Sequence, residues 1–147
     1  MLVRAFTFPL LLSVALASDQ SSDSAPISLS GGIANTFLRT YRIEMRDGAL
    51  LYYNGEWGDQ NVQPERIKPT REQWKAFRKA LDQSRVWQWR KSYDAAVLDG
   101  TAWELKIHYS DRQLDSGGFN GFPPSFERVA AAVERLLGGE PFRADQP

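Results

Sequence analysis

Apolar and polar residues alternate in the segment FLRTYRIEMR (37–46), the pattern of a half-buried β-strand. Residues 37, 41, 43 and 45 are apolar and share one face, and residues 40, 42, 44 and 46 are polar and share the other. An Asp-Gly pair at 47–48 is typical of a hairpin turn. We therefore expect ALLYY (49–53) to return as a second strand, followed by a turn at Asn54-Gly55.

The apolar spacing changes from two residues to between three and four in two later segments, which predicts two amphipathic helices. TREQ (70–73) has the composition of a capping box, and the helix after it carries Trp74, Phe77 and Leu81 on one stripe. The second helix is expected over 126–137, and Gly138-Gly139 ends it.

Three further strands are predicted between these helices. They cover VWQWRKSY (86–93), the alternating segment 102–109, which follows a second Asp-Gly pair, and a short stretch around Leu114. The order ββαβββα does not alternate as a parallel α/β fold does. It predicts an α+β fold with an antiparallel sheet of about five strands and two helices on one face.

The chain has 147 residues, enough for a single domain, and both ends differ from the middle in composition. Residues 1–17 join a basic start to an uncharged apolar run and end in Ala-Leu-Ala, the pattern of a signal peptide for a secreted or periplasmic protein. An uncleaved anchor is the alternative; after cleavage we expect no membrane span. Residues 18–34 are expected to be a flexible leader, 35–139 the domain and 140–147 a disordered tail.

Composition limits the chemistry of the protein. The sequence has no cysteine and one histidine, which excludes disulfides and thiol nucleophiles and argues against a zinc site. Its formal net charge is zero, so no overall field attracts nucleic acid. We expect no cofactor, no metal and no nucleic-acid partner.

The segment DSGGFNGFPPSFERV (115–129) combines glycines and two prolines before the last helix. Such a loop can bind phosphate through converging backbone N–H groups. Pro123 and Pro124 have no N–H to offer, and proline suits the first turn of a helix. We therefore expect a structural turn, in which the glycines allow unusual backbone angles and Asn120 adopts the left-handed region.

The C-terminal end of the chain, over about forty residues that include this loop, resembles an uncharacterised bacterial family. In that family an Asp-Gly-x-x-Trp-x-Leu strand precedes a Gly-x-Asn-x-x-Pro turn and a last amphipathic helix. The matching residues are Asp99, Gly100, Trp103, Leu105, Gly118, Asn120 and Pro123. The resemblance supports the expected fold and implies no activity.

Candidate catalytic residues have simpler explanations. His108 shares a predicted strand face with Glu104 and Lys106, which favours a solvated polar strip over a general base. The aspartates at 94, 99, 111 and 115 lie in or beside turns, where Asp bonds to its own backbone. We assign no catalytic residue and keep a hydrolase acting on envelope polymer, with carboxylates and His108, as the alternative.

Two surfaces are candidates for partner binding. Arg71, Lys75 and Arg78 are predicted to line one face of the first helix, either as a solvated face or as a basic patch for an anionic partner. Tyr53 and Trp57, with Tyr52, are predicted to cluster at the Asn54-Gly55 turn, either to cover the core or to bind.

The sequence thus predicts an exported, non-catalytic binding or inhibitor-like module of the cell envelope. Its partner would be an anionic envelope polymer or a protein. A subunit of a larger assembly is a further alternative, and the sequence does not indicate the oligomeric state.

Overall fold

The computed structural model describes residues 25–96 and 98–144, so the predicted signal peptide lies outside the described residues. A seven-stranded sheet has the strand order β4-β3-β2-β1-β6-β7-β5, and every neighbouring pair is antiparallel except β5 with β7. The elements are β1 (Ser28–Asn35), β2 (Arg39–Arg46), β3 (Ala49–Glu56), β4 (Glu65–Ile67), α1 (Arg71–Gln83), the 3₁₀ helix η2 (Val86–Gln88), β5 (Ser92–Asp94), β6 (Thr101–His108), β7 (Gln113–Phe119) and α2 (Phe126–Leu136).

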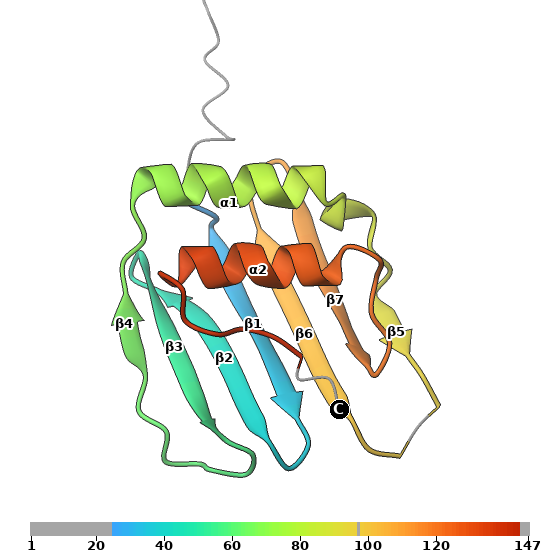
Figure 1. Cartoon of the computed structure of the whole chain (residues 1–147). Coiled ribbons are helices and arrows are strands. Elements are labelled where there is room, and N and C mark those ends of the chain that lie inside the picture. The colour runs from blue at the N-terminus through green and yellow to red at the C-terminus, as the bar shows by residue number, and fades with distance from the viewer. Residues whose placement is uncertain (1–24, 97, 145–147) are drawn as a thin grey trace, which may run out of the picture.

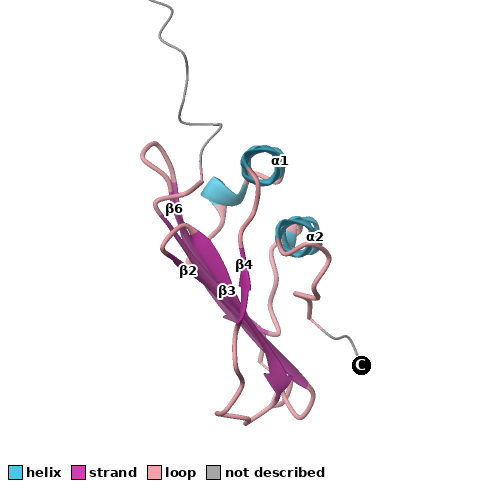
Figure 2. Ribbon diagram, turned by 90° about the vertical axis from the view of Figure 1, so that its left-hand side faces the viewer, coloured by secondary structure: helices cyan, strands magenta, loops and turns pink. Residues whose placement is uncertain are grey.

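Both α-helices cover one face of the sheet and run across its strands, and the other face is open (Figures 1 and 2). The core lies between these layers. Its helix side is formed by Trp74, Phe77 and Leu81 of α1 and by the apolar stripe of α2, and its sheet side by the inward residues of the long strands. The predicted α+β class is confirmed. The predicted number of strands and the order ββαβββα are wrong.

The central strand β1 was missed because its residues are small and polar. The sequence predicts a flexible leader over residues 18–34, yet the backbone of β1 pairs with β2 on one side and β6 on the other. Leu29 and Ile33 face the core, and Ser30, Gly32 and Ala34 face outward. Hydrogen bonds along both edges stabilise a strand that has little apolar area of its own, so composition alone gave the wrong boundary.

The aromatic segment 86–93 is not the long strand that its alternation predicts. Arg85 adopts a left-handed backbone conformation, η2 follows, and only Ser92–Asp94 pairs, parallel to β7. The indole of Trp89 packs against the rings of Trp103 and Phe126 instead, at centroid distances of 5.8 and 6.4 Å. In the first part of this segment, packing of Trp89 against the start of α2 therefore takes the place of strand pairing.

Two further boundaries differ from the sequence analysis. Asn54 and Gly55 are not a turn but belong to β3, which continues to Glu56. The predicted tail also belongs in part to the fold, because Phe142 is buried and its N–H donates to the Glu134 carboxylate at 2.9 Å. Residues 145–147 lie outside the described range.

The helix ends agree with the sequence analysis. Thr70 and Gln73 form the predicted capping box at the start of α1. Gly138 and Gly139 both have positive φ after α2 and donate to carbonyls in its last turn, as expected of a helix C-terminus. Among the described residues, neither helix has the length and apolar composition needed to span a membrane.

Candidate functional site

The predicted basic face of α1 is not one surface. Arg71 and Lys75 are exposed, but the side chain of Arg78 is buried and only 5% of that residue is accessible. The prediction for Arg78 is wrong because residue 78 follows Trp74 by four positions and precedes Leu81 by three, so the helical period places it at the border of the buried stripe. A basic patch of all three residues therefore does not exist.

Arg78 instead joins α1 to the turn between β6 and β7. Its guanidinium donates twice to the Asp111 carboxylate, at 3.0 and 2.8 Å, and twice to Asp82 at 3.1 Å. It also lies over the rings of Tyr109 and Trp87, at 4.6 and 5.3 Å from their centroids. The hydrogen bonds from Arg78 lower the pKa of Asp111, and burial raises the pKa of Tyr109. The Arg78 guanidinium and the carboxylates of Asp82 and Asp111 thus form a structural group of ion pairs.

The three aromatic residues expected to cluster near Gly55 are separated. Tyr52 is buried, and its hydroxyl donates to the carbonyl oxygen of Pro141 at 2.6 Å. Tyr53 points to the open face, where the guanidinium of Arg42 lies 3.9 Å from its ring centroid. Successive strand residues face opposite sides of a sheet, which explains this separation. Trp57 lies beyond the end of β3 and is exposed.

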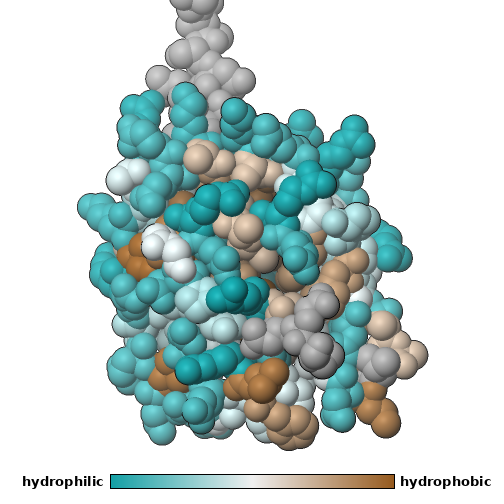
Figure 3. All heavy atoms as spheres, viewed as in Figure 1, coloured by the Kyte–Doolittle hydropathy of each residue, from teal (hydrophilic) through white to brown (hydrophobic). Residues whose placement is uncertain are grey.

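Most exposed large apolar side chains of the described residues lie at one end of the sheet. We call this end, formed by the described residues of the segments 35–39, 56–64, 94–100 (residue 97 excepted) and 119–125, the loop edge; it is the lower end in Figure 1. It carries five exposed residues: Phe37 (73%), Leu38 (53%), Trp57 (50%), Leu98 (98%) and Phe122 (37%). A sixth, Ile27, lies at the other end. Figure 3 shows hydrophobic residues along the lower boundary of the molecule.

Hydrogen bonds connect the loops of the loop edge. The carbonyl of Gly100 accepts from the backbone N–H of Thr36 at 3.1 Å and from its hydroxyl at 2.6 Å. The Trp57 N–H donates to the carbonyl of Leu38 at 2.9 Å, and the rings of Phe37 and Trp57 are 5.2 Å apart. Hydrogen bonds and ring packing therefore connect residues 36–38, 57 and 100, which are distant in sequence, in the free protein.

Asn120 provides a second connection. Its side-chain oxygen accepts from the Thr101 N–H at 2.7 Å, and its amide donates to the carbonyl of Asp99 at 2.8 Å. Asn120 has a φ of 54°, as expected. Gly100 has a φ of 156°, and a Cβ there would overlap the Asn120 side chain. The Asp-Gly and Gly-x-Asn residues of the sequence resemblance thus fasten the β5–β6 loop to the end of β7.

The glycines of this turn have a different role from the one predicted. Gly117, Gly118 and Gly121 do not have positive φ. A Cβ at Gly118 would overlap the carbonyl oxygen of Tyr93, so glycine is required because β5 packs closely against β7. The segment closes the strand and leads into α2, which agrees with its structural interpretation.

The backbone at Phe37 is strained. Its φ is 65°, in the left-handed region that bulky residues rarely adopt. Such a conformation costs on the order of 1–3 kcal/mol. The ring is largely exposed, so it contributes little burial in return. A strained, exposed aromatic residue in a fastened turn is more typical of a binding surface than of a stabilising contact.

Charge distinguishes the loop edge from the other end of the sheet. The four segments of the loop edge contain Glu56, Asp59, Asp94 and Asp99 but one basic residue, Arg39, which gives a formal charge of −3. We call residues 46–49, 67–71, 83–88 and 108–113 the opposite edge. It contains five basic residues, Arg46, Lys68, Arg71, Arg85 and Arg112, and two acidic ones, Asp47 and Asp111, which gives +3.

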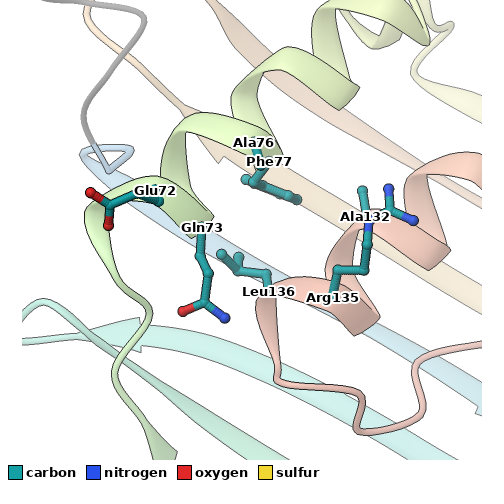
Figure 4. Close-up of a pocket in the computed structure, with 7 residues that line it drawn as sticks. All are labelled: Glu72, Gln73, Ala76, Phe77, Ala132, Arg135 and Leu136. Atoms are coloured by element: carbon teal, nitrogen blue, oxygen red, sulfur yellow. The ribbon is translucent and has the colours of Figure 1, made fainter.

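The surface hollows differ in their polar groups, and one of about 480 Å³ beside α2 is lined by Glu127, Glu134 and Arg143 among others. Another of about 290 Å³ lies between the helices, lined by Gln73 and Phe77 of α1 and Leu136 of α2 among others (Figure 4). Two more, of about 360 and 300 Å³, adjoin on the open face and share Thr40 and Arg42. The first of these includes Tyr53. The two open-face hollows extend toward the loop edge.

His108 lies on the open face, exposed, opposite Ser28 of β1 and Gln113 of β7. Among residues 25–96 and 98–144, no group of three or more His, Cys, Asp or Glu side chains could hold a metal ion. The loop edge combines exposed apolar side chains, a strained turn and hydrogen-bonded loops, and it is therefore our candidate functional site.

The fold and this site describe an α+β protein with an open-faced sheet and an apolar, acidic loop edge. No family model matches the chain, and no match to a curated protein is found. The resemblance seen in the sequence therefore stays a prediction.

Proposed function

We propose that the protein is an exported, non-catalytic binding or inhibitor-like module of the cell envelope, and that its loop edge contacts a protein partner. The observation that carries this proposal is the exposed ring of Phe37 in a strained turn, packed at a tilt against exposed Trp57. The pattern of residues 1–17 supports export.

A protein surface fits the loop edge better than a polysaccharide does. Sugar rings stack on flat aromatic faces, whereas this edge mixes two tilted rings with aliphatic Leu38 and Leu98. Aromatic anchors surrounded by smaller apolar contacts are typical of protein interfaces. The hydrogen bonds between the loops hold these side chains in place, so little ordering entropy is lost on binding.

Capture from an envelope extract tests the proposed surface. The chain from Ser18 onward is immobilised as wild type, as the double variant Phe37→Gly with Trp57→Ala, and as the control Asp47→Gly with Arg71→Ala. The control changes a second residue with positive φ and a second exposed side chain, both at the opposite edge. We expect wild type and control to retain the same protein and the loop-edge variant to lose it. Equal recovery by all three would overturn the proposal.

Export has its own test. The intact mass of the protein isolated from its native host is expected to correspond to a chain that begins near Ser18. A mass that retains Met1, in protein recovered from the cytoplasm, would contradict export without affecting the loop edge.

A further inference from the structure

We infer that the partner presents a basic surface around an apolar depression, and that the acidic residues of the loop edge steer it into place. This inference rests on the proposed function and adds the charge of the partner. It opposes the expectation of an anionic partner, which depended on a basic face that included Arg78.

The positions of the charges carry the inference. Glu56 and Asp99 are exposed, and each is adjacent in sequence to an exposed apolar residue, Trp57 or Leu98. Asp59 and Asp94 are also exposed, but their carboxylates accept from backbone N–H groups of Asn61 and Phe119, which fixes their loops. The apolar residues are thus interspersed with negative charge from two separate loops.

This charge selects among possible occupants. A second copy of the chain would bring two edges of formal charge −3 against each other, and like charges that face each other across an interface are unfavourable. An anionic polymer would be repelled in the same way. A basic protein surface would be attracted, and its association would be faster at low salt because exposed charges are screened as salt rises.

The test separates charge from apolar contact. An envelope extract is divided at pH 7 on a cation exchanger into a retained basic fraction and an unretained fraction, and each is passed over the immobilised wild type. The protein recovered is then the probe for kinetic measurements. The charge variant is Glu56→Lys with Asp99→Lys. Its control, Glu65→Lys with Glu104→Lys, makes the same change in net charge at exposed positions outside the loop edge.

We expect the partner in the basic fraction. The partner should associate with the charge variant about 10-fold more slowly than with wild type at low salt, and the control should show no such decrease. Wild-type association should slow by a similar factor as salt rises from about 20 mM to about 500 mM.

Two outcomes would overturn the inference while leaving the proposed function intact. A partner from the unretained fraction that is lost with Phe37→Gly and Trp57→Ala but unaffected by charge reversal would have no basic surface. Sedimentation that shows self-association through the loop edge would identify a second copy as the occupant. If neither variant reduces capture, the proposed function itself fails.

Discussion

The loop edge and the opposite edge are the two ends of one sheet, yet their side chains have different roles. Next to the opposite edge, Arg78 of α1 is buried against Tyr109 and Trp87 and paired with Asp111 and Asp82. At the loop edge five large apolar side chains reach the surface and one of them is in a strained turn. Charge stabilises the fold at one end, whereas apolar area is left available at the other.

This contrast teaches that a basic segment need not be a basic surface. The cations of α1 predict an anion-binding patch, but ion pairing and packing against aromatic rings remove Arg78 from that surface. The apolar residues of the loop edge come from separate loops, so no single stretch of sequence reveals them.

The largest effect is expected from Arg78. Replacing it with alanine leaves the Asp111 and Asp82 carboxylates without their cation and removes a buried side chain. We expect Arg78→Ala to lower the free energy of unfolding by about 3 kcal/mol, measured by urea denaturation. Arg71→Ala, an exposed residue of the same helix, should stay within about 0.5 kcal/mol of wild type. Equal midpoints for the two variants would contradict a structural role for Arg78.

A smaller effect is expected at Asn120. Asn120→Ala removes two side-chain hydrogen bonds and leaves the Thr101 N–H without its acceptor. We expect the free energy of unfolding to fall by about 2 kcal/mol. Because the same bonds fasten the β5–β6 loop, hydrogen exchange at residues 98–101 should accelerate more than exchange in α1. Uniform acceleration throughout the protein would argue against a local role.

Phe37 should respond in the opposite direction. Glycine accepts a φ of 65° without strain but has more freedom in the unfolded chain. Phe37→Gly is therefore expected to keep or raise the free energy of unfolding, by up to about 1 kcal/mol, while partner capture is lost. A loss of more than 1 kcal/mol in thermal or urea unfolding would mean that the ring stabilises the fold and is not kept for binding.

The smallest effect concerns pH. The pKa of Asp111 is lower in the fold than its ordinary value because Arg78 donates hydrogen bonds to its carboxylate. The unfolded chain therefore takes up this proton first as pH falls, so the stabilisation is present above about pH 4 and is lost as pH falls further. Asp111→Asn should give a shallower decline of stability between about pH 5 and pH 2. If the free energy of unfolding falls equally steeply below pH 5 in wild type and in Asp111→Asn, Asp111 does not have this role.

The sequence predicts the parts of this fold that depend on local patterns. The alternation in β2 and β6, the capping box at Thr70 and the glycines after α2 each depend on nearby residues, and each prediction agrees with the structure. The central strand β1 could not be predicted this way, because its stability comes from pairing with β2 and β6, which are distant in the chain.

The candidate site could be predicted only in part. The sequence pattern predicts Trp57 as a possible contact, but it places Phe37 on the buried face of a strand and does not indicate Leu38 or Leu98. The turn at Thr36 forms because Gly100 accepts its hydrogen bonds, a tertiary contact that periodicity does not reveal. One available signal was an Asn-Thr-Phe-Leu-Arg run in which two bulky apolar residues follow each other at the start of a strand.

Hydrogen exchange of the protein, free and with the captured partner, tests the central claim most directly. If the loop edge is the binding surface, protection on binding should be concentrated at residues 36–39, 56–59 and 98–101. The segments 67–79 and 108–113 should exchange at the same rate in both states. Protection confined to α1 and the opposite edge, with no change at Phe37 or Trp57, would contradict the claim.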